Sequence, residues 1–291
     1  KIGWQLQEFY QDDDYLVEKI NRVCDIKDVM LVHLYHAEPI NREELLAWIK
    51  TQRERVAPYI GDVSLYLNDA IKEGKNILLE GQLGTMKDPD HGIYPMVTSS
   101  SPLAAFGAVS CGFAPYEIKK IVVVSKAYSS AVGAGEFVSE IFGHDAELLR
   151  NHGGDGGEYG ATTGRPRRVG WYDCVASKYG CRVQGCTDVA FTVVDDLGYL
   201  DEIPVCIGYE YKGEILKEFP VTTKLKDCKP VYKTFPVWKC DIGGIKNYEE
   251  LPEKCRDYIE FIEGEIGFPI TMISNGPARE DIIYRESPLK K

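Results

Sequence analysis

The chain has 291 residues, a length that allows one large domain or two of ordinary size. Hydrophobic residues make up 44% and charged residues 27%, which is typical of a globular protein with a sizeable core. The net charge of −11 argues against a general nucleic-acid binder but leaves phosphate-bearing small molecules open. No long apolar run is present, so the sequence predicts no membrane span and no membrane partner.

The chain starts at Lys1 without an initiator Met and enters helical sequence soon afterwards, so we expect functional parts to lie upstream. Its 9 cysteines are scattered through apolar segments, which does not fit a disulfide scaffold. No pair has the Cys-x-x-Cys spacing of a zinc site. These features predict a cytoplasmic protein whose cysteines are reduced and buried.

Three helices are predicted in the first quarter of the chain. Residues 12–37 begin with three acidic residues, which favour the positive end of a helix dipole. Residues 41–44 form a capping box that opens a second helix. A third helix is expected near 62–73, with Gly74 just beyond its end.

Buried strands and helices alternate in the rest of the chain. The predicted strands are 76–80, 121–125, 189–194 and 269–273, with a hairpin of 205–211 and 214–219 that turns at 212–213, and helices are expected from 165 through 176 and over 247–265. The pattern predicts a single α/β domain over residues 1–291, with a mostly parallel central sheet and flanking helices.

Four segments stand at predicted strand ends, where parallel sheets bind their ligands. They are 80–95, 126–137, 160–171, and Asp195 together with 274–277. One glycine loop would be an ordinary connection. Four loops rich in Gly, Thr, Ser and Arg predict a shared site.

The sharpest signal is segment 160–171. Thr162 and Thr163 precede Arg165 and Arg167, so two hydroxyls and two guanidinium groups gather within a few residues. Arginine binds carboxylates and phosphates through paired, charge-assisted hydrogen bonds, so the pattern predicts an anion receptor. An arginine-rich turn on an ordinary solvated face is the alternative.

Three further patterns have plainer alternatives. Asp88, Asp90 and His91 could bind a metal, although Asp and Pro favour a hydrogen-bonded turn. The glycine-rich stretch 151–157 fits either a lid beside the arginines or a surface loop. The two histidines of 33–36 lack an acidic or cysteine partner, which favours a structural role.

Several long motifs in one register resemble the adenylosuccinate synthetase family, over residues 1–285. The strongest matches are Asp-His-Gly-x-Tyr-Pro-x-Val-Thr-Ser-Ser at 90–100, Lys-Ala-Tyr-Ser at 126–129 and Val-Gly-Ala-Gly at 132–135. Segment 160–171 matches the family's Gly-Ala-Thr-Thr-Gly-Arg-x-Arg-Arg-x-Gly-Trp, and 274–277 matches its Ser-x-Gly-Pro. The resemblance implies that family's P-loop-like α/β fold.

The resemblance also implies a GTP-dependent ligase of AMP biosynthesis. The family condenses L-aspartate with inosine monophosphate (IMP): the purine 6-oxygen is phosphorylated from GTP with Mg²⁺, and the aspartate amine displaces the phosphate. By the matching motifs, the site residues would be Thr162, Thr163, Arg165 and Arg167 for aspartate, Leu83, Val132, Gly133 and Arg165 for IMP, and Asp195, Ser274, Gly276 and Pro277 for GTP. Because family members are dimers, we expect a cytoplasmic homodimer.

Two family motifs do not occur in this chain. The phosphate loop Gly-Asp-Glu-Gly-Lys-Gly-Lys would supply the general base Asp, and the Gly-His-x-x-Gly-His segment would supply the acid His. We therefore assign no catalytic residue to this chain and expect the Mg²⁺ ligands upstream.

Other departures concern the contacts to the purine acceptor. Leu83 stands where the family has Gln and Ala131 where it has Arg, while a usual nucleotide-binding Thr is missing from 101–103. A further departure lies beside the guanine site, where Val193 replaces a Lys of the family. The aspartate and guanine motifs are kept, but the acceptor contacts are altered. A paralogue that uses another purine, or a non-catalytic nucleotide-binding or assembly protein, therefore stays open.

Overall fold

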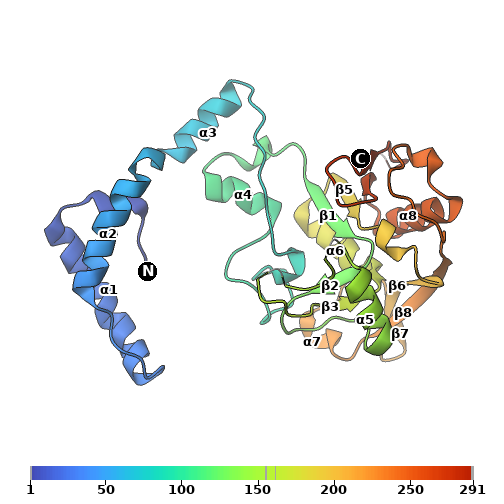
Figure 1. Ribbon diagram of the computed structural model, residues 1–291, viewed down its shortest axis with the longest axis horizontal. Helices are drawn as coiled ribbons and strands as arrows, with labels where there is room; N and C mark the ends of the chain where they lie inside the picture. The colour runs from blue at the N-terminus through green and yellow to red at the C-terminus, as the bar shows by residue number, and fades with distance from the viewer. Residues whose placement is uncertain (1, 155, 161, 290–291) are drawn as a thin grey trace. The chain divides into compact units, whose positions relative to one another are not determined.

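The computed structural model describes residues 2–154, 156–160 and 162–289. The chain divides into two compact units, Lys1–Gly74 and Lys75–Lys291 (Figure 1). Among the described residues, every strand lies in the second unit. A single α/β domain over 1–291 stays a prediction.

The first unit contains the three helices that the sequence predicted. They are α1 (Asp13–His33), α2 (Arg42–Val56) and α3 (Val63–Lys72), with the short 3₁₀ helices η1 (Leu6–Tyr10) and η2 (Ala57–Tyr59). Asp12, Asn41 and Asp62 cap the three helices by accepting hydrogen bonds from backbone N–H groups of their first turns. The small core of this unit consists of Leu16, Ile20, Cys24 and Ile49.

The second unit is built on a four-stranded sheet of order β1-β5-β9-β10. Its strands are β1 (Val122–Lys126), β5 (Asp188–Thr192), β9 (Ile270–Ser274) and β10 (Ile282–Tyr284). The first three are parallel, and β10 runs antiparallel to β9. The predicted strands at 121–125, 189–194 and 269–273 and the mostly parallel sheet are therefore confirmed.

Two smaller sheets complete the strand architecture. One pairs β2 (Ser129–Ala131) with β3 (Arg168–Gly170), and the other joins β4 (Tyr172–Asp173), β6 (Glu202–Tyr211), β7 (Glu214–Leu216) and β8 (Lys229–Pro236). β6 and β7 form the predicted hairpin, in which Lys212 and Gly213 take left-handed backbone angles.

Five helices and four 3₁₀ segments belong to the described part of the second unit. They are η3 (Thr85–Lys87), α4 (Ala104–Cys111), η4 (Pro115–Glu117), α5 (Gly143–His152), α6 (Cys174–Gln184), η5 (Asp195–Leu197), α7 (Thr222–Leu225), η6 (Tyr248–Glu250) and α8 (Glu253–Ile266). α6 and α8 contact each other (Figure 1). Tyr258 of α8 packs against Phe191 of β5, and its hydroxyl donates to Ala127 O at 2.7 Å, just after β1.

The predicted strand at 76–80 is wrong. The segment forms no ladder with any described residue, and Leu78 is 92% exposed. β1 is an edge strand, and its Val122 and Val124 are exposed rather than buried as predicted. An apolar run becomes a buried strand only where neighbouring strands or helices cover it.

The predicted helix from 165 through 176 is also wrong in its first half. Residues 168–170 and 172–173 form strands, and α6 begins only at Cys174. Pro166 and Gly170 oppose a helix there, while β2 offers a pairing partner. α5 was not predicted, and the helix expected at 247–265 begins as α8 only after Pro252.

Candidate functional site

Two of the four predicted strand-end segments, 126–137 and Asp195 with 274–277, meet at the carboxyl edge of the central sheet, whereas 80–95 and 160–171 follow no strand of the described chain. The Ala127 N–H, after β1, donates to Thr192 O at 2.8 Å, and the Val194 N–H, after β5, donates to Ser274 O at 3.4 Å. The ends of three parallel strands are thereby joined by direct backbone hydrogen bonds. This edge is where parallel sheets bind their ligands.

The arginine segment forms a narrow backbone loop that projects two arginines. The Arg167 N–H donates to Glu158 O at 2.9 Å, and the Gly160 N–H donates to Arg165 O at 2.8 Å. A β-carbon on Gly160 would lie 2.8 Å from Thr163 Oγ1, so a larger residue there would displace that hydroxyl. Thr162 and Thr163 stand exposed at the tip of the loop.

The two arginines differ in how many hydrogen-bond partners the protein gives their guanidinium groups. Among described residues, the exposed guanidinium of Arg165 has no hydrogen-bond or ion-pair partner. Arg167 Nη1 donates to Glu158 Oε2 at 3.3 Å, while Arg167 Nε is buried without a partner in the described chain. Both side chains thus keep donors available to an anion.

The Val132–Gly133 loop is held by a third arginine. Arg168 Nη1 donates to Gly133 O at 3.1 Å and to Gly135 O at 2.8 Å, and its Nε donates to Glu140 Oε1 at 2.8 Å. Arg168 therefore has a structural role that the run of three arginines did not reveal. Val132 itself is 62% exposed.

The loop that carries Leu83 is tied to the Val132–Gly133 loop by Lys87. Lys87 Nζ donates to Met96 O at 3.2 Å and to Ala134 O at 3.4 Å. Leu83 has a φ of 76° and a 55% exposed side chain. A left-handed backbone is uncommon for a branched residue, and here it holds a leucine out of the core.

The Asp88 region forms the hydrogen-bonded turn that was one of the two interpretations. Asp88 Oδ1 accepts from the N–H groups of Asp90 and His91, and Oδ2 accepts from the Ser101 hydroxyl at 2.5 Å. Burial opposes ionisation of Asp88, but these bonds outweigh it and hold its pKa below the usual value. The part of the chain that the structure describes contains no group of three or more His, Cys, Asp or Glu that could hold a metal.

The guanine-binding candidates stand on two neighbouring strand ends. Asp195 opens η5 after β5, and burial, together with the charges of Asp281 and Asp241, raises its pKa. Ser274 ends β9, and its hydroxyl donates to Gly276 O at 3.0 Å. A carboxylate beside a strand-end loop is suited to accept hydrogen bonds from a nucleobase edge.

Sequence reasoning assigned no role to Asn275, which fixes this loop. Its side chain is fully buried, and Nδ2 donates to Ile242 O at 2.6 Å and to Ile245 O at 2.9 Å. Gly276 is close to Asp281, because a β-carbon there would lie 2.6 Å from Asp281 Oδ2. In the sequence, only the position of Asn275 between Ser274 and Gly276 could have indicated this role.

The glycine-rich stretch 151–157 contacts the guanine end through its backbone. The Gly154 N–H donates to Asp196 Oδ2, next to Asp195. Burial raises the pKa of Asp196 to about 6. Residue 155 lies outside the described residues, and a lid in this stretch stays a prediction.

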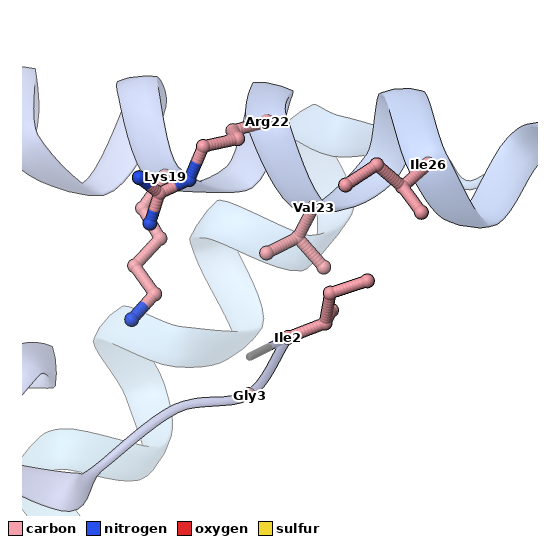
Figure 2. Close-up of a pocket in the computed structure, with 6 residues that line it drawn as sticks. All are labelled: Ile2, Gly3, Lys19, Arg22, Val23 and Ile26. Atoms are coloured by element: carbon pink, nitrogen blue, oxygen red, sulfur yellow. The ribbon is translucent and has the colours of Figure 1, made fainter.

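Features elsewhere do not join this site. A pocket of about 300 Å³ in the first unit is lined by Ile2, Gly3, Lys19, Arg22, Val23 and Ile26 (Figure 2) and contains no predicted site residue. Both histidines of 33–36 are exposed. Six of the nine cysteines are buried, while Cys240 is exposed. Nowhere in the described ranges is there a helix with the length and apolarity to cross a membrane.

Glycine-rich and arginine-bearing loops at the carboxyl edge of a mostly parallel sheet are typical of nucleotide-binding α/β enzymes. The chain belongs to the adenylosuccinate synthetase family, whose sequence profile matches residues 1–283.

Relatives named adenylosuccinate synthetase cover most of this chain. It is 43% identical to the protein of Thermodesulfovibrio yellowstonii and 42% identical to that of Caldicellulosiruptor bescii, matching 95% and 94% of this chain. The chain spans 64% of the length of each of these curated relatives. The structure of fully ligated adenylosuccinate synthetase from Plasmodium falciparum matches with a TM-score of 0.88 and 30% identity, over 98% of this chain and 67% of that one.

Proposed function

We propose that this chain provides the aspartate site, the guanine site and part of the IMP site of a GTP-dependent ligase. The ligase condenses L-aspartate with IMP to form adenylosuccinate, by way of a 6-phosphoryl intermediate. The observation that carries the proposal is a pair of arginines on one narrow loop. Arg165 is exposed, and Arg167 donates to Glu158 through Nη1 while its Nε has no partner among the described residues. The comparisons do not favour the non-catalytic alternative or another purine acceptor.

In the aspartate site, Arg165 and Arg167 bind the dicarboxylate substrate. Their free guanidinium donors suit charge-assisted hydrogen bonds to carboxylate oxygens. Thr162 and Thr163, exposed at the tip of the same loop, add hydroxyl donors. These groups orient the substrate so that its amine faces the purine.

In the guanine site, Asp195 accepts hydrogen bonds from the N–H groups of the base. Ser274, Gly276 and Pro277 frame the base from the neighbouring strand end. A carboxylate selects guanine over adenine, because adenine offers an acceptor where guanine offers an N–H donor.

In the acceptor site, Leu83, Val132 and Gly133 line the IMP pocket, and Arg165 also reaches the nucleotide. Support comes from Lys87 and Arg168, which tie the two loops to the rest of the site. The exposed side chains of Leu83 and Val132 are available to a ligand.

Catalytic acid–base groups are assigned to no residue of this chain, whose sequence lacks both motifs that carry them in the family. The described residues contain no group of three or more His, Cys, Asp or Glu that could hold a metal, so no residue of this chain is assigned to Mg²⁺. A homodimer and a cytoplasmic location are further parts of the proposal. Nine cysteines, most of them buried, support a reducing compartment.

The proposal is tested by calorimetric titration of the 291-residue protein with L-aspartate, in the presence of GDP and IMP. We expect Arg167→Ala to weaken aspartate binding by about 30- to 150-fold, the cost of a lost charge-assisted contact. Arg167→Lys should restore little, because an ammonium cannot form the fork. Arg182→Ala is the control, since Arg182 Nη1 bonds to Glu218. Equal aspartate affinity in Arg167→Ala and wild type would contradict the assignment.

A further inference from the structure

Glu158 is a buried carboxylate beside the arginine loop to which neither the motifs nor the proposed function gives a role. Its side chain is 3% exposed, and donors from β1, from just before β2 and from the arginine loop converge on it. Glu158 Oε1 accepts from Lys126 Nζ and, at 2.6 Å, from the Tyr128 hydroxyl. Glu158 Oε2 accepts from Arg167 Nη1 at 3.3 Å.

The carboxylate determines which part of Arg167 faces a ligand. With Nη1 directed to Glu158, the remaining donors of the guanidinium are Nε and Nη2. Nε is buried and has no partner among the described residues. A buried donor without a partner is costly, so this edge of the guanidinium is suited to receive a carboxylate.

Two positive side chains, Lys126 and Arg167, face the negative Glu158 in this cluster. The carboxyl of Asp196 also interacts with Glu158 and Lys126. Burial opposes ionisation of Glu158, but hydrogen bonds from Lys126 and Tyr128 and the two nearby positive charges outweigh it and lower its pKa. The carboxylate therefore keeps two like charges together.

The cluster also links the loop to the sheet. Lys126 ends β1, and its Nζ also donates to Ser130 Oγ of β2 at 3.1 Å. The backbone of Glu158 accepts from the Arg167 N–H at 2.9 Å. Glu158 thus holds Arg167 through both backbone and side chain and connects it to the end of a central strand.

We propose that Glu158 is a positioning residue of the aspartate site, which presents the Nε–Nη2 edge of Arg167 to a substrate carboxylate. The proposal rests on the proposed function, because it needs Arg167 to bind that substrate. It predicts that Glu158 affects aspartate binding selectively and affects guanine-nucleotide binding little, because Asp195 stands on a different loop.

The test compares Glu158→Gln with Glu263→Gln in the 291-residue protein, by calorimetric titration with L-aspartate and with GDP. Glu263 is a matched control, since it is 2% exposed and paired with Arg285 but lies in α8. We expect Glu158→Gln to weaken aspartate binding about 10- to 100-fold, as when a charge-assisted bond is lost, with GDP binding changed less than about twofold. Both variants should lower Tm, but only Glu158→Gln should lose aspartate affinity.

Two further variants keep the test informative if Glu158→Gln does not fold. Glu158→Asp keeps the charge but shortens the reach to Arg167, so aspartate binding should fall by about fivefold or more. Tyr128→Phe keeps the contact between Glu158 and Arg167 and should bind aspartate within about threefold of wild type. Wild-type aspartate affinity in a folded Glu158→Gln or Glu158→Asp variant would overturn the positioning role and leave the proposed function intact. A wild-type protein that binds GDP but not aspartate would overturn both.

Discussion

At the guanine end of the candidate site (Asp195, Ser274, Gly276 and Pro277), polar groups stand on strand ends and are fixed by buried hydrogen bonds. At the acceptor end (Leu83, Val132 and Gly133), the residues stand on loops and expose their side chains. Asn275 at the first end is fully buried, whereas Leu83 at the second is 55% exposed. The two ends differ in how strongly the fold determines them.

This difference indicates where substrate preference can change without loss of the fold. A substitution at the guanine end removes hydrogen bonds on which the loop depends, so base recognition and stability are coupled there. A substitution at Leu83 or Val132 removes little buried surface. Three of the departures from the family motifs, at Leu83, Ala131 and 101–103, concern the acceptor contacts.

The largest effect is expected for Asn275→Ala. The variant leaves the carbonyl groups of Ile242 and Ile245 buried without their donor, at about 1–3 kcal/mol each. We expect a loss of about 2–4 kcal/mol of unfolding free energy and a Tm lower by roughly 4–12 °C, measured by thermal and urea denaturation. Leu83→Ala, at the exposed end, should change stability by less than about 0.5 kcal/mol. Equal losses in the two variants would refute the contrast.

Base selectivity at the guanine end is expected to depend on Asp195. Asp195→Asn places an amide N–H₂ where the base needs an acceptor, so the preference for GTP over ATP should fall by about 10- to 100-fold. Titration of both nucleotides against each variant measures the ratio. Asp257→Asn is the control, because Asp257 is exposed on α8 and is not among the charges that raise the pKa of Asp195. If Asp195→Asn retains the preference for GTP, Asp195 is not the residue that recognises the guanine base.

Periodicity and motifs predicted the parallel strands and the helices of the first unit, because apolar patterns and capping residues are local sequence signals. They failed at 76–80 and 168–173, where pairing partners decide the conformation. An apolar run at 76–80 finds no covering strand among the described residues, whereas Arg168–Gly170 pairs with β2. Local sequence contains no information about such distant partners.

The same limit applies to the candidate site. Its loops could be predicted from the sequence, because glycine and arginine motifs are local. The roles of Glu158, Arg168 and Asn275 could not, because each depends on partners far along the chain. The sequence also could not distinguish Arg167 from Arg168. Arg167 keeps free donors, whereas Arg168 donates its hydrogen bonds to loop carbonyls and to Glu140.

At the acceptor end, a smaller effect is expected for Leu83→Gln. A glutamine can pair with the purine edge as donor and acceptor, so IMP affinity should rise about 5- to 30-fold, the worth of one satisfied polar group. Titration of IMP against wild type, Leu83→Gln and Gln82→Ala measures this. If Leu83→Gln binds IMP like wild type while Gln82→Ala loses binding, the neighbouring Gln82 has taken over the contact and the altered-acceptor hypothesis is wrong.

The smallest effect is expected in the pH dependence of stability. It is measured as the difference in unfolding free energy between wild type and Asp196→Asn, a variant at the guanine end. Burial raises the pKa of Asp196 to about 6, above the unfolded value of about 3.9, so its stabilising contribution is complete below pH 4 and is lost as pH rises through 6. Glu158, whose pKa is lowered, contributes with the opposite sign in both proteins. Because Asp196 is only partly buried, solvent screens its charge, and we expect wild type to lose about 1 kcal/mol relative to Asp196→Asn between pH 4 and 7, in urea denaturation at each pH. Asp257→Asn in α8 is the exposed control for the charge change itself. A difference between wild type and Asp196→Asn that stays constant over this range would show that the Gly154 N–H compensates fully for burial.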